Sequence, residues 1–426
     1  MSAPRARCAA ALALPLLLPA LLHAQARLPV VGEGPVQQLD DGGIRWRTTD
    51  RRFEVRARAL VQFDGRALPG GALDEPSGGF LLRRSRLLVE GSFGRRLAFR
   101  VMPEFGNGVV VLEDAFADVT FGRGAWLRAG RMRTPFGQER ARLIIEQLFA
   151  ERSLASQLTS NRDNGAQLTG ELANGRLEYT VGVFNGGPDN QSLDRNPTDA
   201  VDVTGRVAWA FRLRRVGAAT QGMALGLNGT TGDQRGTANA PFLGTYRTSA
   251  GTPLFAYRAD GTSAGTTLAA GTRTRWGAFA WVHEGPFGFN AEYVQSRQAL
   301  ARGTLAGEVT HEAWMAHAAW TLTGEPSSGN LITPAKPFDP DAGQWGAFQL
   351  VARISRLSLD PAAFPVFADP ATQARAATAW AAGLNWYVTR LTKALVYYEQ
   401  TRFTGGLPGG DRPDERVVGI RLQLML

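Results

Sequence analysis

Residues 126–165 read WLRAGRMRTPFGQERARLIIEQLFAERSLASQLTSNRDNG and contain the feature that decides the fold. A strand-like run ends at Pro135-Phe136-Gly137, and an alternating pattern resumes at Gly165 as GAQLTGEL. The roughly two dozen residues between them fit neither a strand nor a plain turn, and loops of that length are usually functional. We expect this segment, residues 138–164, to fold inward across a barrel lumen as a pore-constricting loop. Its candidate anion-binding residues are Arg140, Arg142, Arg152 and Arg162.

The chain on either side of this loop reads as about sixteen strands, connected by short turns and long loops in alternation, which is typical of outer-membrane barrels. In the last run, Val418, Ile420 and Leu422 alternate with small or polar residues. Asn174-Gly175 between two alternating runs predicts a hairpin. No helical periodicity supports a βα fold. The sequence therefore predicts an all-β fold, a transmembrane antiparallel β-barrel with a long inward-folded loop.

A soluble sandwich with one solvated face would show similar alternation. Tryptophans near the ends of the apolar faces favour the membrane barrel instead, because bilayer interfaces select aromatic girdles. These residues are Trp126, Trp209, Trp320, Trp345, Trp380 and Trp386.

The first residues predict export. Arg5 and Arg7 precede an apolar run, residues 8–22, and Ala24-Gln25-Ala26 forms a cleavage site of the A-x-A kind. We expect residues 1–26 to be a signal peptide, residues 27–52 a periplasmic N-terminal segment and residues 53–426 the barrel. Cys8 is the only cysteine and lies within the signal, so the mature chain has no disulfide.

Positive charge is carried almost entirely by arginine. The formal net charge is +9, and Lys336 and Lys393 are the only lysines. Alternate residues of a strand face the same side of the wall, and we call this alternation strand parity. It predicts a row of arginines that face the lumen, the lumen ladder: Arg84, Arg86, Arg100, Arg131, Arg133, Arg206, Arg212, Arg273, Arg275, Arg353 and Arg421. By the same parity Glu90, Glu104, Asp114 and Asp118 face inward and neutralise part of this charge. Alternatively, some strand arginines lie near the rims and bind lipopolysaccharide phosphates or water.

Several stretches resemble the phosphate-selective porins O and P of Gram-negative outer membranes. They occur in family order over most of the mature chain and include FLLRRSRLLVEG (80–91), LEDAFADVTF (112–121), GRMRTPFGQER (130–140), NRDNGAQLTG (161–170), YTVGVFNG (179–186) and GAFQLVARIS (346–355). The resemblance implies a trimeric, sixteen-stranded porin whose third extracellular loop folds inward and carries pore arginines. It also implies that the Pro-rich periplasmic connection near Lys336 tucks into the lumen.

Two features depart from that family. Its pore is typically lined by lysines as well as arginines, and lysine is almost absent here. The final residue is Leu426, where barrels of this kind usually end in phenylalanine. The first departure bears on phosphate selectivity, and the second bears on the strength of the assembly signal.

Enzyme signals are weak. GTSAG (261–265) matches G-x-S-x-G, but a Gly/Thr/Ala-rich loop surrounds it and no strand–turn–helix is predicted there. His311 and His317 would share a face of one strand, with no third metal ligand nearby. We therefore predict no catalytic residues, no metal, no cofactor and no nucleic-acid partner.

The sequence favours a non-enzymatic outer-membrane porin, a passive, anion-selective channel for phosphate or similar oxyanions. The expected partners are phosphate or other small anions, outer-membrane lipid and lipopolysaccharide, and two further copies of the chain in a homotrimer. The alternatives are a general or structural outer-membrane barrel, or a barrel lipid hydrolase.

Overall fold

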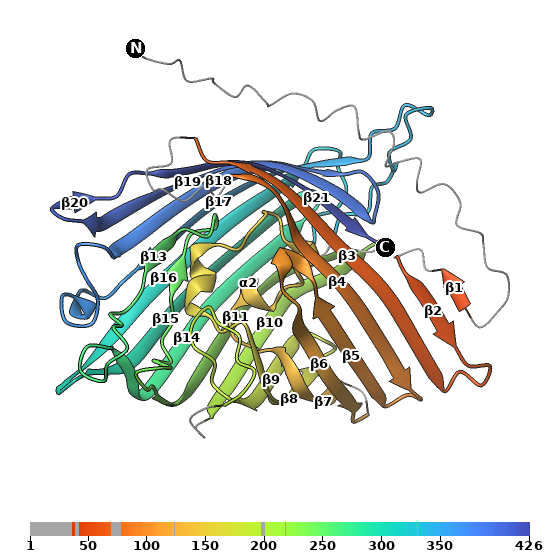
Figure 1. Ribbon diagram of the computed structural model, residues 1–426. Coiled ribbons are helices and arrows are strands. Elements are labelled where there is room, and N and C mark those ends of the chain that lie inside the picture. The colour runs from red at the N-terminus through yellow and green to blue at the C-terminus, as the bar shows by residue number, and fades with distance from the viewer. Residues whose placement is uncertain are drawn as a thin grey trace, which may run out of the picture.

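The computed structural model describes residues 36–38, 42–69, 78–122, 124–196, 201–217, 219–329 and 331–426. Sixteen antiparallel strands close into a barrel, as the sequence predicted (Figure 1). They are β3 (Phe53–Ala67), β4 (Gly79–Phe93), β5 (Leu97–Glu104), β6 (Val111–Thr120), β7 (Ala125–Arg133), β8 (Arg162–Leu172), β9 (Leu177–Phe184), β10 (Asp202–Val216), β11 (Ala219–Arg235), β14 (Leu268–Glu284), β15 (Phe287–Arg302), β16 (Leu305–Thr321), β17 (Ala347–Ser358), β18 (Ala374–Tyr387), β19 (Thr392–Leu407) and β21 (Glu415–Met425). The expected signal peptide lies outside the described residues, as do residues 27–35 and 39–41 of the expected N-terminal segment.

The remaining elements are short. β1 (Val36–Gln38) and β2 (Ile44–Arg47) extend the barrel sheet next to β3, while β20 (Gly410–Asp411) pairs with β19. The connections contain β12 (Tyr246–Arg247), β13 (Pro253–Phe255), α2 (Gln138–Ala141) and the 3-10 turns η2 (Gly106–Gly108), η3 (Ile144–Glu146), η4 (Leu154–Leu158) and η5 (Pro361–Ala363). No helix among the described residues is long and apolar enough to cross a membrane.

The barrel closes where β21 pairs with β3, from Met425 against Leu60 to Val418 against Ala67. A hydrogen bond of 2.6 Å from Gln62 to Gln423 spans this seam on the lumen side. The first half of β3 extends beyond β21 and pairs with β2. Every strand of the barrel thus has two neighbours, which is the arrangement that a lipid environment requires of backbone polar groups.

Turns at one end of the barrel are mostly short, and connections at the other end are mostly long (Figure 1). Asn174-Gly175 lies in the β8–β9 turn, where Ala173, Asn174 and Gly175 all have positive φ, so this hairpin prediction is confirmed. The exception at the short-turn end is the connection between β16 and β17. Within it Ser327 contacts the inward-facing His283, and Ile332 packs with Ala347 and Tyr387. This connection therefore folds against the inner wall.

The two faces of the wall differ in chemistry. Outward side chains include the exposed Trp209, Trp320, Trp345 and Trp380 together with many aliphatic residues. Inward side chains are largely polar, and many are hydrogen-bonded to one another across neighbouring strands. Because successive residues of a strand point to opposite faces, the alternating sequence produces an apolar exterior and a polar lumen.

Candidate functional site

The segment between β7 and β8, residues 134–161, forms what we call the inner loop. It carries α2, η3 and η4, and α2 lies inside the barrel (Figure 1). β8 already begins at Arg162, so this arginine belongs to the wall.

Wall side chains hold the inner loop by its backbone. These side chains donate hydrogen bonds to backbone carbonyl groups of the inner loop. A carbonyl group buried without a hydrogen-bond partner would destabilise the fold. The donors come from the wall opposite β7: Lys393 Nζ to Gln147 (2.6 Å), Asn385 Nδ2 to Leu148 (3.0 Å), Gln423 Nε2 to Ile145 (3.2 Å) and the Arg421 guanidinium to Ala150.

The start of the loop is fixed by carboxylates. Glu292 on β15 accepts hydrogen bonds from the backbone N–H groups of Gln138 (2.5 Å) and Glu139 (2.8 Å), the first residues of α2. The carboxylate of Glu139 in turn accepts from the N–H and hydroxyl groups of Ser153. These bonds satisfy helix donors that lack an intrahelical partner and tie the two arms of the loop together.

Apolar packing fills one side of the lumen. Phe136 and Leu158 of the inner loop are buried in one cluster with Tyr246, Leu254 and Phe255 of the segment that connects β11 to β14. The same cluster includes inward residues of β15 to β18. The space left for solutes therefore lies on the other side of the inner loop, against β4 to β7.

A cavity of about 540 Å³ occupies that space. Eight arginines and three glutamates line it: Arg83, Arg84, Arg86, Arg133, Arg140, Arg152, Arg162, Arg247, Glu104, Glu113 and Glu151. Counting formal charges gives 8 minus 3, a surplus of five positive charges among the described lining residues. In a confined site of low dielectric such a surplus strongly favours anions.

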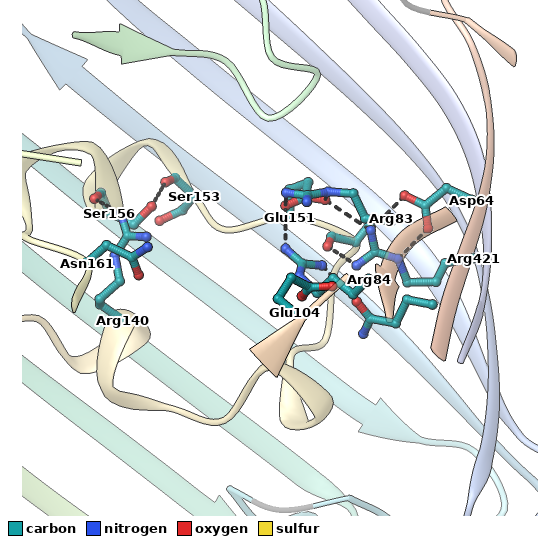
Figure 2. A network of polar contacts seen from close by, with 12 residues as sticks. Asp64, Arg83, Arg84, Glu104, Arg140, Glu151, Ser153, Ser156, Asn161 and Arg421 are labelled. Carbon is teal, nitrogen blue, oxygen red and sulfur yellow. Dashed lines mark hydrogen bonds and ion pairs between the residues drawn. The ribbon is translucent and has the colours of Figure 1, made fainter. Parts of the chain in front are cut away.

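Glu151 is the centre of the largest ion-pair network at this site (Figure 2). Its carboxylate accepts from Arg83 (2.6 Å), Arg84 (3.1 Å), Arg66 (2.9 Å) and Arg421 (3.0 Å). Burial alone would raise the pKa of Glu151, but the four guanidinium groups outweigh it and hold the pKa well below its usual range. A carboxylate of the protein thus occupies the position among the arginines that an anion would take.

The four predicted loop arginines differ in how many hydrogen bonds and ion pairs they make within the protein. Arg140 donates to Thr159 (3.0 Å) and to the Ser156 carbonyl (2.6 Å). Burial lowers the pKa of Arg140 to about 10, which leaves it charged at neutral pH. Arg142 lies outside the cavity lining and donates to Asn290 (2.6 Å). Arg162 on β8 pairs with Glu113 and Asp114 at 2.6 and 2.7 Å.

Of the four predicted loop arginines, Arg152 has the fewest partners for its guanidinium group. Its Nε and one Nη are buried without a hydrogen-bond partner among the described residues. Burial and the nearby guanidinium of Arg140 lower the pKa of Arg152. Arginine nevertheless keeps its proton in proteins. A buried cation surrounded by like charge is stabilised by any anion that enters the cavity.

The predicted lumen ladder divides into two groups. Arg84, Arg86 and Arg133 line the cavity. Most of the others pair with wall or loop groups: Arg100 with Glu90, Arg273 and Arg275 with Asp202, Arg353 with Glu399, Arg421 with Asp64, and Arg206 with Gln138. Arg131 donates to the carbonyl groups of Leu112 and Leu193 and pairs with Asp194, away from the cavity lining. Arg212 is exposed near the short-turn end of β10.

Two residues that line the cavity, Arg83 and Glu113, were not predicted from strand parity, because β-bulges place them there. On β4, Gln62 pairs with Arg84 and Phe63 with Leu82, so Arg83 is the extra residue and reaches Glu151. On β6, Met102 pairs with Asp114 and Pro103 with Leu112, so Glu113 is the extra residue and reaches Arg86. A bulge redirects a side chain in this way, and Pro103, which lacks an N–H group, is compatible with the interrupted ladder.

The chain matches one protein-family model, described as phosphate-selective porin O and P, over residues 53–426. No curated protein matches the chain.

Solved structures with a similar fold are outer-membrane proteins. The chain is 10% identical to OmpT of Vibrio cholerae, in vitro folded and in its trimer form, with a TM-score of 0.53 and coverage of 88% of this chain and 99% of that chain. It is 9% identical to the outer membrane channel DcaP of Acinetobacter baumannii, with a TM-score of 0.54 and coverage of 90% and 100%. It is 13% identical to an anion-selective porin from Comamonas acidovorans, with a TM-score of 0.53 and coverage of 88% and 100%. At these identities the likeness concerns the fold.

Proposed function

Because the chain belongs to the phosphate-selective porin O and P family, we propose that this outer-membrane porin is a passive, anion-selective channel for phosphate or similar oxyanions. The observation that carries the proposal is the cavity beside the inner loop. Its eight arginines face three glutamates, and two guanidinium nitrogens of Arg152 have no hydrogen-bond partner among the described residues.

The chemistry of arginine fits this role. A guanidinium group presents several donors in a plane and replaces the hydration of an oxyanion with charge-assisted hydrogen bonds. Passage also requires that the ion leaves, so binding has to be weak and distributed over several sites. Here four of the eight arginines that line the cavity, Arg83, Arg84, Arg86 and Arg162, already pair with a carboxylate, which moderates their hold on a solute.

A channel explains the site better than an enzyme does. Ser263 of GTSAG lies in an exposed turn that leads into β14, and the strand–turn–helix that positions such a nucleophile is not formed around it. The cavity, by contrast, is lined by eight arginines against three glutamates, and an excess of charge of one sign is what a pore uses to select ions by sign.

Assembly and partners form part of the same proposal. A homotrimer is supported by the family resemblance and by the trimer form of the Vibrio cholerae protein that shares this fold. Outer-membrane lipid and lipopolysaccharide would surround the apolar exterior. The N-terminal 26 residues would be removed as a signal peptide during export.

The test is a reversal-potential measurement in a planar bilayer. Purified protein in an approximately tenfold KCl gradient at low salt should give a potential of the sign that chloride permeation produces, because the field of the arginines is least screened there. Inorganic phosphate should then reduce the chloride current in a concentration-dependent way. A potential of the opposite sign would overturn the proposal.

A further inference from the structure

A hollow opens on the outside of the barrel at its short-turn end, between the β8–β9 turn and the β10–β11 hairpin. β10 pairs with β9 only as far as Trp209 against Leu177, whereas its pairing with β11 continues to Val216 against Ala219. The hairpin therefore projects past β9 and leaves a notch beside the turn. This rim notch has a volume of about 520 Å³ and is lined by Arg176, Trp209, Ala210, Phe211, Arg212 and Met223.

A β-bulge brings Arg212 to the rim notch. Strand parity places Arg212 on the lumen side, but the pairing of β10 with β11 shifts register between Phe211 and Arg214. Arg212 has a φ of 51°, a left-handed conformation that is uncommon outside glycine. Gly222 opposite the bulge has to be glycine, because a Cβ there would lie 2.9 Å from the carbonyl oxygen of Arg212. Bulges re-aim side chains, and this one leaves Arg212 exposed beside Phe211 and Met223.

The rim notch combines an apolar part with a cationic part. Trp209, Phe211 and Met223 are apolar side chains that are 40%, 38% and 38% exposed on the outer wall. Arg176 and Arg212 make no ion pair with a described residue, and no carboxylate is among the described residues that line the rim notch. Tryptophan at the end of an apolar wall lies at the membrane interface. The apolar part therefore meets the acyl chains of the bilayer, and the two arginines meet its head groups.

We propose that the rim notch binds an anionic phospholipid of the periplasmic leaflet. Short turns of such barrels face the periplasm, so the lipid comes from that leaflet, and lipopolysaccharide in the opposite leaflet is out of reach. The guanidinium groups of Arg176 and Arg212 bind the phosphate oxygens through charge-assisted hydrogen bonds. The start of an acyl chain packs on Trp209, Phe211 and Met223. The inference rests on the outer-membrane barrel and does not depend on which ions the pore selects.

The wild-type test counts the lipids that the purified protein retains. The protein in detergent is incubated with an equimolar mixture of phosphatidylglycerol and phosphatidylcholine, and bound lipid is counted by native mass spectrometry. Phosphatidylglycerol should be retained about tenfold better, because each arginine near a membrane surface attracts an anionic lipid and the choline group of the other lipid opposes this attraction. An excess of inorganic phosphate should not displace it, since free phosphate makes no apolar contacts. Equal retention of the two lipids, or displacement by inorganic phosphate, would overturn the inference.

The variant test combines Arg176→Gln with Arg212→Gln, which should reduce the preference to about twofold. The matched control combines Arg95→Gln with Arg96→Gln, which removes two exposed arginines from the β4–β5 turn at the same end of the barrel. The control should keep the tenfold preference. A preference that survives in the first variant, or an equal loss in both, would refute the assignment to the rim notch. Heat-modifiable gel migration checks that both variants fold. Failure of the proposed channel function is distinguishable, because it appears in the reversal potential and not in lipid retention.

Discussion

Replacing Glu151 with Gln removes the carboxylate around which the arginines of the cavity are arranged. The variant keeps the size of the side chain, but it frees Arg83, Arg84, Arg66 and Arg421 from their shared counter-charge. The surplus of positive charge among the described lining residues increases from five to six. Anions should therefore enter the cavity more readily and be held longer than in the wild type.

Coulomb's law gives the size of the effect. For an anion about 8 Å from the lost charge, an effective dielectric constant of about 40 gives roughly 1 kcal/mol. That energy corresponds to about a fivefold lower half-blocking concentration of phosphate. The four arginines lose a buried partner, and breaking a buried pair typically costs about 3–5 kcal/mol of stability. We expect the lower part of that range, because the guanidinium groups keep other partners such as Asp64.

The assay is phosphate block of chloride current in planar bilayers, with Glu308→Gln as the control. Glu308 pairs with Arg297 on the exposed outer face, so the control changes net charge equally but far from the cavity. Glu151→Gln should shift the half-blocking concentration, and Glu308→Gln should not. An unchanged or weaker block in Glu151→Gln would refute the view that this carboxylate competes with solute anions. Equal shifts in both variants would attribute the effect to net charge alone.

Three further outcomes are expected. Arg152→Gln should raise the half-blocking concentration of phosphate about fivefold and leave the temperature of heat-modifiable gel migration unchanged, because two of its nitrogens already lack partners. Arg421→Gln should lower that temperature clearly, since the buried Asp64 loses one of its two arginine partners, Arg66 being the other, and breaking a buried pair typically costs about 3–5 kcal/mol, whereas the exposed Arg416→Gln on the same strand should not. The stability that Glu151 contributes should be complete above its ordinary pKa of 4.5 and lost as pH falls through the lowered pKa of the folded protein. The difference in melting temperature between wild type and Glu151→Gln should therefore shrink only in acid, and a difference that shrinks between pH 8 and 6 would contradict this assignment.

The barrel was predictable because its signal is repeated in every strand. Alternation of residues such as Val418, Gly419, Ile420 and Arg421 fixes which face meets lipid, and the turn at Asn174 follows from local backbone chemistry. The long connection between β7 and β8 was recognisable by its length alone. Each of these properties depends on residues close together in the sequence.

Whether each arginine is paired within the protein or lines the cavity was not predictable in the same way. Parity assigns Arg275 and Arg84 to the same ladder, yet Arg275 is bound by Asp189 and Asp202 from distant elements, while Arg84 lines the cavity. Pairing across the lumen depends on which strands the barrel brings opposite one another, and strand parity carries no such information. The role of Glu151 was missed for the same reason, since its partners lie on β3, β4 and β21.

The two β-bulges beside the cavity have a consequence for how such channels change over time. Arg83 and Glu113 reach the lumen because β4 and β6 each contain one residue more than the neighbouring strand pairs with. The type of side chain at these two positions is not what directs them inward. Deleting a single residue at either position would restore the regular ladder and remove one charge from the pore wall, with the inner loop untouched. Strand length is thus an independent route by which a lineage can alter what its pore admits. Comparisons of relatives should accordingly examine one-residue gaps within strands as closely as substitutions in the loop.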